Sequence, residues 1–170
     1  MDELGRMSVE DFKNVEKLPL MVVLDNIRSL SNIGSIFRTS DAFRVAGIQL
    51  CGITAKPPHR DIQKTALGAT ESVDWAYHAT TLECIQNLQA EGWTVLAIEQ
   101  AEKTTELRDF EVTSEGKYAI VLGHEVTGVD QAVIDACDGC IELAQHGTKH
   151  SLNVSVCGSI VIWEFFGKLS

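Results

Sequence analysis

Short apolar runs that alternate with segments of helical character are the feature that most constrains how this chain can fold. We expect strands over residues 18–27, 48–54, 93–99, 117–123 and 140–144. Helices are expected over residues 32–45, 81–92, 130–137 and about 151–166. Strands that read as continuous apolar runs are buried on both faces, and strands that alternate with helices pair in parallel. The pattern therefore predicts an α/β fold, a parallel sheet with helices on both faces.

The chain length suits a single domain over residues 1–170, because 170 residues are enough for one real core and few for two. Residues 1–17 form an N-terminal extension in this division. Ser8 with Asp11 three residues later predicts a capping box and a short helix there. The prolines of 55–61 predict a loop with a short helix after it, and the polar segment 102–116 is expected to be exposed. Gly47 is expected to end the helix over 32–45.

Composition points to a soluble cytoplasmic protein without a membrane anchor. The opening "MDELGRMSVEDF" is acidic and has no apolar run, and Glu164 interrupts the last apolar stretch before it could span a bilayer. The five cysteines, an odd number, favour reduced thiols. Cys137 and Cys140 form a lone CxxC, which is either a redox pair or two small apolar residues around a turn; without a second pair it predicts no zinc site.

Charge is unevenly distributed along the chain. The net charge is −10, which by itself argues against an anionic partner such as nucleic acid. The segment 26–64 nevertheless carries an excess of basic residues over Asp41 and Asp61. Its bases are Arg28, Arg38, Arg44, Lys56, Arg60 and Lys64. Such a district either holds an anionic ligand or forms a solvated face.

The loops that follow the expected strands are the places to look for a ligand, because ligands of parallel α/β sheets bind beyond the carboxyl ends of the strands. "GHEVTGVD" follows 117–123, with Glu125 between two glycines, and "QHGTKHSLN" follows 140–144. No GxGxxG follows a strand and no Lys-Ser/Thr pair completes a phosphate loop, so a standard nucleotide fold is not indicated. His146 and His150 have no obvious third ligand, and we expect no metal.

The last helix is apolar nearly all round, which predicts that it is buried. A buried helix start needs partners for its free backbone N–H groups, and Ser151 is the expected N-cap. Asn153 follows in the expected first turn, where it is free either to face a ligand or to serve the structure alone.

Three motifs occur in the order and spacing of a known family. "NIGSIFRT" (32–39), "VLGHEVTGV" (121–129) and "LAQHGTKHSLNVSV" (143–156) resemble the three motifs of the SpoU (TrmH-like) family, in the SPOUT class of RNA methyltransferases. The resemblance covers about residues 18–166. Leu143 and Ala144 stand where the family usually has Ile-Pro, and no added RNA-binding domain precedes the core.

This resemblance implies a deep C-terminal trefoil knot over 118–166 and S-adenosyl-L-methionine (AdoMet) as the cofactor, bound in the knot. It also implies a homodimer in which the closing helix is buried. The cofactor-binding residues that it implies are Ile98, Leu122, Gly123, Leu143, Ser151 and Leu152.

The implied reaction is methyl transfer to a ribose 2′-hydroxyl of RNA, with tRNA favoured and rRNA open. The implied catalytic residues are Arg38, Asn32, Glu125 and Asn153. Arg38 is either a catalytic group or an ordinary phosphate contact, and Asn32 is equally at home as a helix cap. The residues expected to contact RNA are Arg28, Arg44, Lys56, Arg60, Lys149 and His150. Two alternatives are a non-catalytic knotted module that binds RNA or cofactor, and an unrelated small-molecule α/β enzyme.

Overall fold

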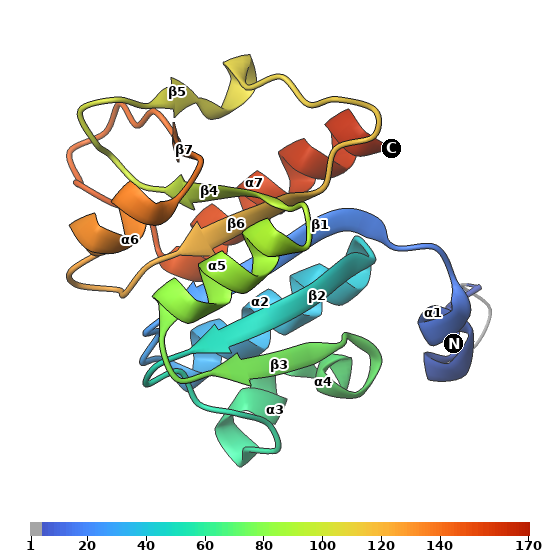
Figure 1. Ribbon diagram of the computed structural model, residues 1–170. Coiled ribbons are helices and arrows are strands. Elements are labelled where there is room, and N and C mark those ends of the chain that lie inside the picture. The colour runs from blue at the N-terminus through green and yellow to red at the C-terminus, as the bar shows by residue number, and fades with distance from the viewer. Residues whose placement is uncertain (1–4) are drawn as a thin grey trace.

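The structure, a computed structural model, describes residues 5–170 as a seven-stranded sheet with helices on both faces (Figure 1). The first four residues of the expected extension 1–17 lie outside this description. The strands are β1 Leu18–Asp25, β2 Val45–Cys51, β3 Trp75–His78, β4 Thr94–Ile98, β5 Thr105–Glu106, β6 Tyr118–Leu122 and β7 Gly139–Glu142. Their order is β3-β2-β1-β6-β4-β7-β5, and every pair is parallel. All strands therefore end at one edge of the sheet, which we call the carboxyl edge.

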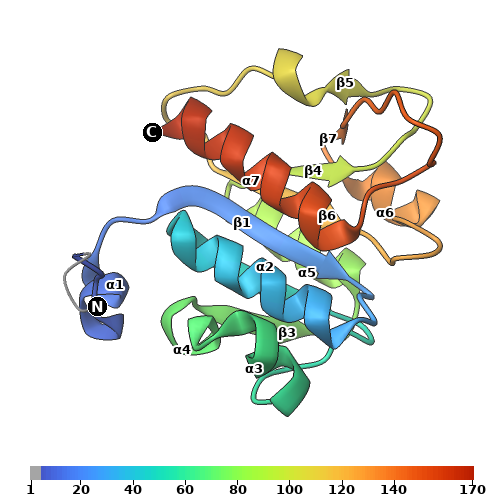
Figure 2. The same ribbon diagram turned by 180° about the vertical axis from the view of Figure 1, so that it is seen from behind.

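Helices cover both faces of this sheet, as predicted. They are α1 Val9–Asn14, α2 Leu30–Ala42, α3 Arg60–Ala66, α4 Ala69–Ser72, α5 Thr81–Ala90, α6 Gln131–Ala136 and α7 Val154–Leu169, with a 3₁₀ turn η1 at Leu107–Asp109. α5 and α6 lie on the face that Figure 1 turns to the viewer. α2 and α7 lie side by side on the opposite face, with α3 and α4 beside α2 (Figure 2).

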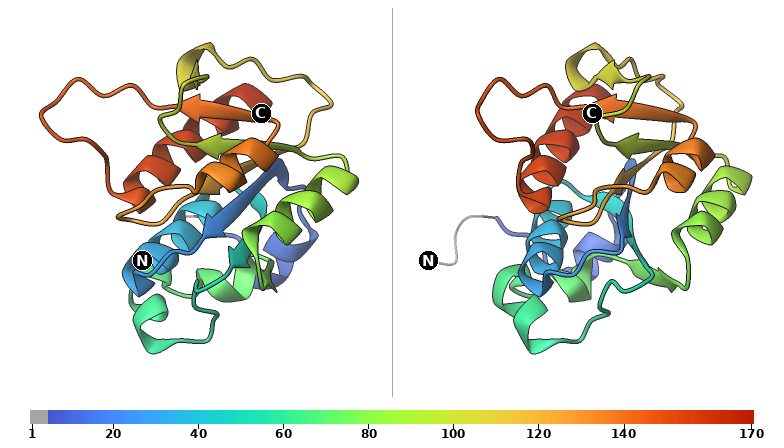
Figure 3. Two further views of the ribbon diagram at one scale, coloured as in Figure 1. Left: turned by 60° about the vertical axis from the view of Figure 1, so that its left-hand side comes forward. Right: turned by 90° about the vertical axis from the view of Figure 1, so that its left-hand side faces the viewer.

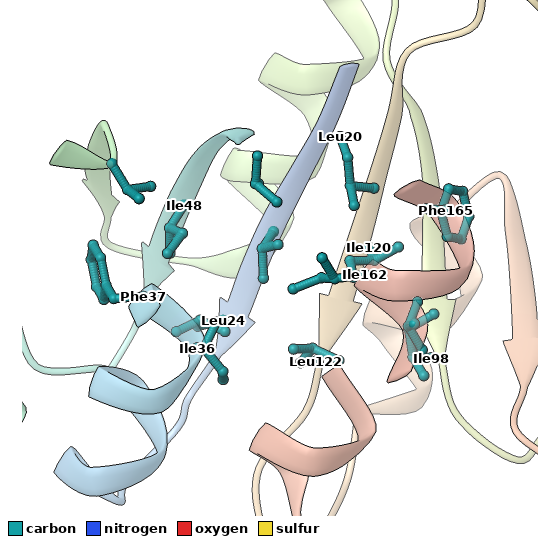
Figure 4. Packing of buried hydrophobic residues seen from close by; sticks show 14 of the residues in the cluster. Leu20, Leu24, Ile36, Phe37, Ile48, Ile98, Ile120, Leu122, Ile162 and Phe165 are labelled. Atoms are coloured by element: carbon teal, nitrogen blue, oxygen red, sulfur yellow. The ribbon is translucent and has the colours of Figure 1, made fainter. Parts of the chain in front are cut away.

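The core divides into two clusters because side chains of each buried strand alternate between the faces. Leu24 of β1 and Ile120 of β6 join the cluster under α2 and α7, together with Phe37 and Phe165 (Figure 4). Val23, the neighbour of Leu24, belongs to the cluster under α5 and α6. The strands are thus buried on both sides, which explains their continuous apolar sequences.

Two helix starts differ from the prediction. α7 begins at Val154, and its N-cap is Asn153, whose Oδ1 accepts hydrogen bonds from the Ser155 and Val156 amides at 2.9 and 3.3 Å. The prediction of Ser151 as the cap is wrong, because Ser151 is an exposed residue of the preceding loop.

α2 begins at Leu30 with Ser29 as its N-cap, so Asn32 lies inside the first turn and does not open the helix. Gly47 does not end α2 either. The helix ends at Ala42, the turn is made by Arg44 with φ 51°, and Gly47 lies within β2.

Two strands, β3 and β5, escaped the prediction. β3 is an edge strand whose two central residues are exposed, so it lacks the apolar run of a buried strand. β5 has only two residues and lies in the segment 102–116, which was expected to be exposed. That expectation is wrong at Leu107, which is buried against the α2 and α7 side of the core.

The N-terminal capping box is confirmed, since Ser8 caps α1 and its Oγ accepts from the Asp11 amide at 3.1 Å. Among the helices of residues 5–170, none combines the length and the hydropathy needed to cross a membrane.

Candidate functional site

A cavity of about 690 Å³ opens at the carboxyl edge, where β4, β6 and β7 end. All six residues that the family resemblance assigns to the cofactor line it: Ile98, Leu122, Gly123, Leu143, Ser151 and Leu152. Its outer wall is the segment 143–153, a long loop that extends away from the sheet between β7 and α7 (Figure 3). The size is that of an ordinary small-molecule site.

The loop after β6 closes on itself beneath the cavity. His124 and Gly128 exchange two backbone hydrogen bonds of 3.1 and 2.8 Å, which bring Gly123 against Gly128. A Cβ on Gly123 would lie 2.4 Å from the Gly128 carbonyl carbon, and Gly128 itself has φ +68°. Both glycines are therefore required by geometry, the first by the close approach of two backbones and the second by its left-handed conformation.

Glu99, which the sequence analysis did not assign to the site, ties the end of β4 to this loop. Its Oε2 accepts from the Val129 amide at 3.1 Å, and its Oε1 accepts from the Gln100 amide at 2.9 Å. Glu99 also lines the cavity. The available signal was its position, since it directly follows a buried strand at the carboxyl edge.

Glu125 joins the loop after β6 to the start of α2. Its carboxylate accepts from the Ser29 amide at 2.9 Å, from the Arg28 amide at 3.1 Å and from the Asn32 Nδ2 at 3.3 Å. Burial alone raises the pKa of this carboxyl, but the hydrogen bonds outweigh burial and hold the pKa below its usual value. Glu125 is therefore ionised at neutral pH and holds the loop after β6 against the start of α2.

Asn32 relays this arrangement to α7. Its Nδ2 donates to Glu125, and its Oδ1 accepts from the Asn153 Nδ2 at 3.2 Å. Asn153 uses its own Oδ1 to cap α7. The three motifs thus meet in one chain of hydrogen bonds, Glu125 to Asn32 to Asn153, at the rim of the cavity.

Arg38 is not brought to this cluster within the chain. It lies on the exposed side of α2, it does not line the cavity, and it takes part in none of the ion pairs formed within residues 5–170. Asn32 and Arg38 are six residues apart, which places them roughly 120° apart around the helix axis.

The residues expected to contact RNA fall into two groups. Arg28, Lys56, Arg60, Lys149 and His150 are exposed on loops or helix starts at the carboxyl edge, and His150 also lines the cavity. Arg44 is exposed at the opposite edge, directly before β2. The first group therefore shares the carboxyl edge, and Arg44 lies apart from it.

A buried carboxyl lies behind the site at the end of β1. Asp25 is 2 % exposed, and its Oδ1 accepts from the Thr81 hydroxyl and from the side-chain Nδ2 of Asn26. Burial is the largest influence on this group and raises the pKa of Asp25 above its ordinary value.

The five cysteines of this chain are free thiols. Burial raises the pKa of the Cys137 thiol to about 12, which keeps it protonated and argues against a reactive CxxC. Among residues 5–170, no three His, Cys, Asp or Glu side chains gather as a metal site.

The donor set of the cavity fits a nucleoside-type ligand such as AdoMet. Ile98, Leu122, Leu143 and Leu152 supply apolar walls. The backbone of Gly123 and the loop 143–153 supply hydrogen-bonding groups, as apolar sites with few polar contacts do.

Known proteins resemble this chain in sequence. A TrmH family protein of Staphylococcus haemolyticus, named "Putative TrmH family tRNA/rRNA methyltransferase", is 31 % identical over 160 residues, which cover 94 % of this chain and 63 % of that protein. The 23S rRNA (guanosine-2′-O-)-methyltransferase RlmB of Vibrio parahaemolyticus is 30 % identical, with 95 % of this chain and 64 % of that protein covered. The chain thus spans less than two thirds of the length of these relatives.

Solved structures share the fold. The AdoMet-bound rRNA methyltransferase from Sinorhizobium meliloti superposes with a TM-score of 0.83 at 25 % identity, covering 94 % of this chain and 60 % of that one. The TrmH/SpoU tRNA modifying enzyme of A. aeolicus gives 0.81 at 22 % identity, covering 94 % and 81 %, which supports the fold alone. The model of the SpoU rRNA methylase family matches residues 19–163, and the chain therefore belongs to that family.

Proposed function

We propose that this protein binds AdoMet in the cavity and transfers its methyl group to a ribose 2′-hydroxyl of RNA. The observation that carries the proposal is the hydrogen-bonded chain from Glu125 through Asn32 to Asn153 at the cavity rim. The relatives support it, since one is named as a guanosine-2′-O-methyltransferase and a structural neighbour contains AdoMet. Transfer RNA is the preferred substrate class, with ribosomal RNA as the second.

The cavity residues divide the work of holding the cofactor. Leu122, Leu143 and Leu152 cover its apolar surface, and the loop 143–153 offers backbone groups to its polar edges. When bound, AdoMet would supply an electrophilic methyl group, and the S–C bond that breaks would leave S-adenosylhomocysteine. The cavity lies beside Asn153, so the acceptor ribose is expected to enter at this rim.

The residues around the rim order the acceptor. Glu125 is ionised and saturated with hydrogen bonds, which suits positioning rather than proton removal. Asn153 presents its amide from the start of α7 and is held by Asn32. A ribose hydroxyl loses its proton as the new O–C bond forms, and Arg38 is our candidate to orient the hydroxyl and stabilise the developing charge. A guanidinium already carries its full complement of protons and is a poor base, so an RNA phosphate beside it is our candidate to take the proton.

We infer that two copies of the chain associate through α7. Val156, Ile160 and Trp163 recur at helical spacing and are exposed, and Trp163 is 60 % exposed. They line an apolar groove together with Phe43. An apolar stripe of this kind fits a self-complementary interface. Sedimentation that shows only a monomer at micromolar concentration would refute it.

Dimerisation also offers a place for Arg38. α2 lies beside α7 in the helix layer that carries the groove, and Arg38 is exposed on α2 (Figure 2). We propose that the partner subunit's Arg38 completes each site. Mixed dimers of Arg38→Ala and Asn153→Ala subunits are expected to recover turnover that neither variant has alone. Mixed dimers without turnover would contradict this arrangement and place Arg38 in the site of its own subunit.

We also propose that the chain is knotted over 118–166. The C-terminal end of α7 lies beside the connection from η1 to β6, and Lys168 Nζ donates to the carbonyls of Leu107 and Phe110 at 2.9 and 2.7 Å (Figure 1). The structural neighbours in the SpoU family support this topology. An experimental backbone trace that contains no knot would refute this proposal.

A titration with AdoMet, run in parallel with a methyl-transfer assay on unmethylated RNA, separates an enzyme from a binding module. The enzyme proposal predicts binding and turnover together. Binding without turnover on tRNA or rRNA would favour the non-catalytic alternative.

A further inference from the structure

An exposed aromatic and apolar surface lies on the side of the carboxyl edge away from the cavity. Ile53, in the loop after β2, is 62 % exposed, and Tyr77, on the edge strand β3, is 41 % exposed. Both are large side chains that the core of the protomer does not use. We call Ile53, Lys56 and Tyr77 the platform.

The platform is held rigidly. The Tyr77 hydroxyl donates to the Gly52 carbonyl at 2.8 Å, which fixes the ring on the loop after β2. Lys56 Nζ lies over this ring, 4.4 Å from its centroid. A fixed ring loses little side-chain freedom when a flat ligand stacks on it, and the cation beside it attracts an anion.

Hydrogen bonds connect the platform to the loop whose backbone binds Glu125. The Ile53 amide donates to the Asn26 Oδ1 at 3.0 Å, and the Ile27 amide donates to the buried Thr54 Oγ1 at 3.1 Å. Arg28 is the next residue, and its amide holds Glu125. The loops after β1 and β2 therefore form one continuous surface from the platform to Glu125.

Basic side chains are exposed along this surface although the protein is acidic overall. Arg28, Lys56 and Arg60 are exposed along it. The acid Asp61 is paired with Lys64 at 2.6 Å, so it is partly neutralised. Exposed cations next to an exposed ring match a strand that carries both phosphates and unstacked bases.

We propose that the platform binds unpaired nucleotides of the RNA next to the methylated one, with a base stacked on Tyr77 and a phosphate on Lys56. The proposal rests on the proposed function and adds that the substrate is single-stranded at this position. β3 lies three strand spacings from β6, about 14 Å, so the platform is within reach of nucleotides that flank the target ribose.

The test measures RNA binding without AdoMet, by fluorescence anisotropy of a short labelled oligoribonucleotide, single-stranded or annealed to its complement. The wild-type protein is expected to prefer the single strand. Tyr77→Ala should weaken single-strand binding about fivefold or more, since base stacking on an aromatic is of that size. Tyr77→Phe keeps the ring and loses only the Gly52 contact, so it should retain most of the affinity that Tyr77→Ala loses.

Charge is tested separately. Lys56→Ala should lower the slope of log affinity against log salt by about 1, the expectation for one lost phosphate contact, whereas Lys13→Ala on α1 should leave it unchanged. Tyr77→Ala binding within twofold of the wild type, with thermal stability retained, would overturn the proposal. A Tyr77→Phe variant as weak as Tyr77→Ala would overturn it too, by assigning Tyr77 to loop support. Because these readouts need no methyl transfer, they are separate from the outcome of the turnover assay.

Discussion

Asn153 combines two roles that substitution can separate. Its Oδ1 caps α7 through the Ser155 and Val156 amides, and its Nδ2 donates to Asn32. Asn153→Ala removes both, and loss of an N-cap costs about 1 kcal/mol. At about 2–4 °C per kcal/mol for a domain of this size, the melting temperature should fall by that amount. Asn153→Ser keeps an equivalent cap, because Ser and Asn rank alike at this position, but it lacks the amide donor.

Thermal unfolding and methyl transfer to unmethylated RNA, measured on both variants, distinguish the roles. We expect Asn153→Ser to melt close to the wild type and yet to lose at least tenfold in turnover, as Asn153→Ala does. Loss of a positioned hydrogen-bonding group in a transition state is commonly of that order or more. Full turnover by Asn153→Ser would reduce the role of Asn153 to capping, and a low melting temperature for Asn153→Ser would refute the assignment of the cap.

Three further changes test the structure around the site. Burial raises the Asp25 pKa, so wild-type stability falls as pH rises from the unfolded-state pKa to the folded-state pKa. Asp25→Asn should therefore melt at a higher temperature than the wild type at pH 7, with a smaller gain at acidic pH. Equal gains in melting temperature at both pH values would contradict this. Gly123→Ala places a Cβ 2.4 Å from the Gly128 backbone, which should open the loop and weaken AdoMet binding at least tenfold by calorimetry, while unchanged affinity would show the loop to be plastic. Lys168→Met removes the hydrogen bonds to the carbonyls of Leu107 and Phe110 and should lower the melting temperature by several degrees. An unaltered melting curve would show that these hydrogen bonds do not stabilise the fold.

Much of the fold could be predicted because buried parallel strands carry their own signal. The apolar runs of β1, β4 and β6 predict buried strands, and each of these strands is covered on both faces. β3 gave no such signal, because an edge strand needs apolar residues on only part of its surface. The start of α7 was misplaced because Ser151 and Asn153 are equally good caps by residue type, and only the backbone geometry selects between them.

The site was predictable in its members and not in its contacts. The family resemblance named Glu125, Asn32 and Asn153, yet their hydrogen bonds join residues 93 and 121 positions apart, and no local rule specifies such pairings. Glu99 was missed because it lies outside the motifs. The separation of Arg38 from Asn32 could have been predicted from the sequence, since two residues six positions apart in a helix point in directions roughly 120° apart.

The most direct test of the central claim is to identify the methylated nucleoside. Unmethylated tRNA and rRNA are incubated with this protein and isotopically labelled AdoMet, digested to nucleosides and resolved by mass spectrometry. The account predicts label only in 2′-O-methyl nucleosides, and no label when the acceptor position carries a 2′-deoxyribose. Label on a base, or label retained in the 2′-deoxy RNA, would contradict it.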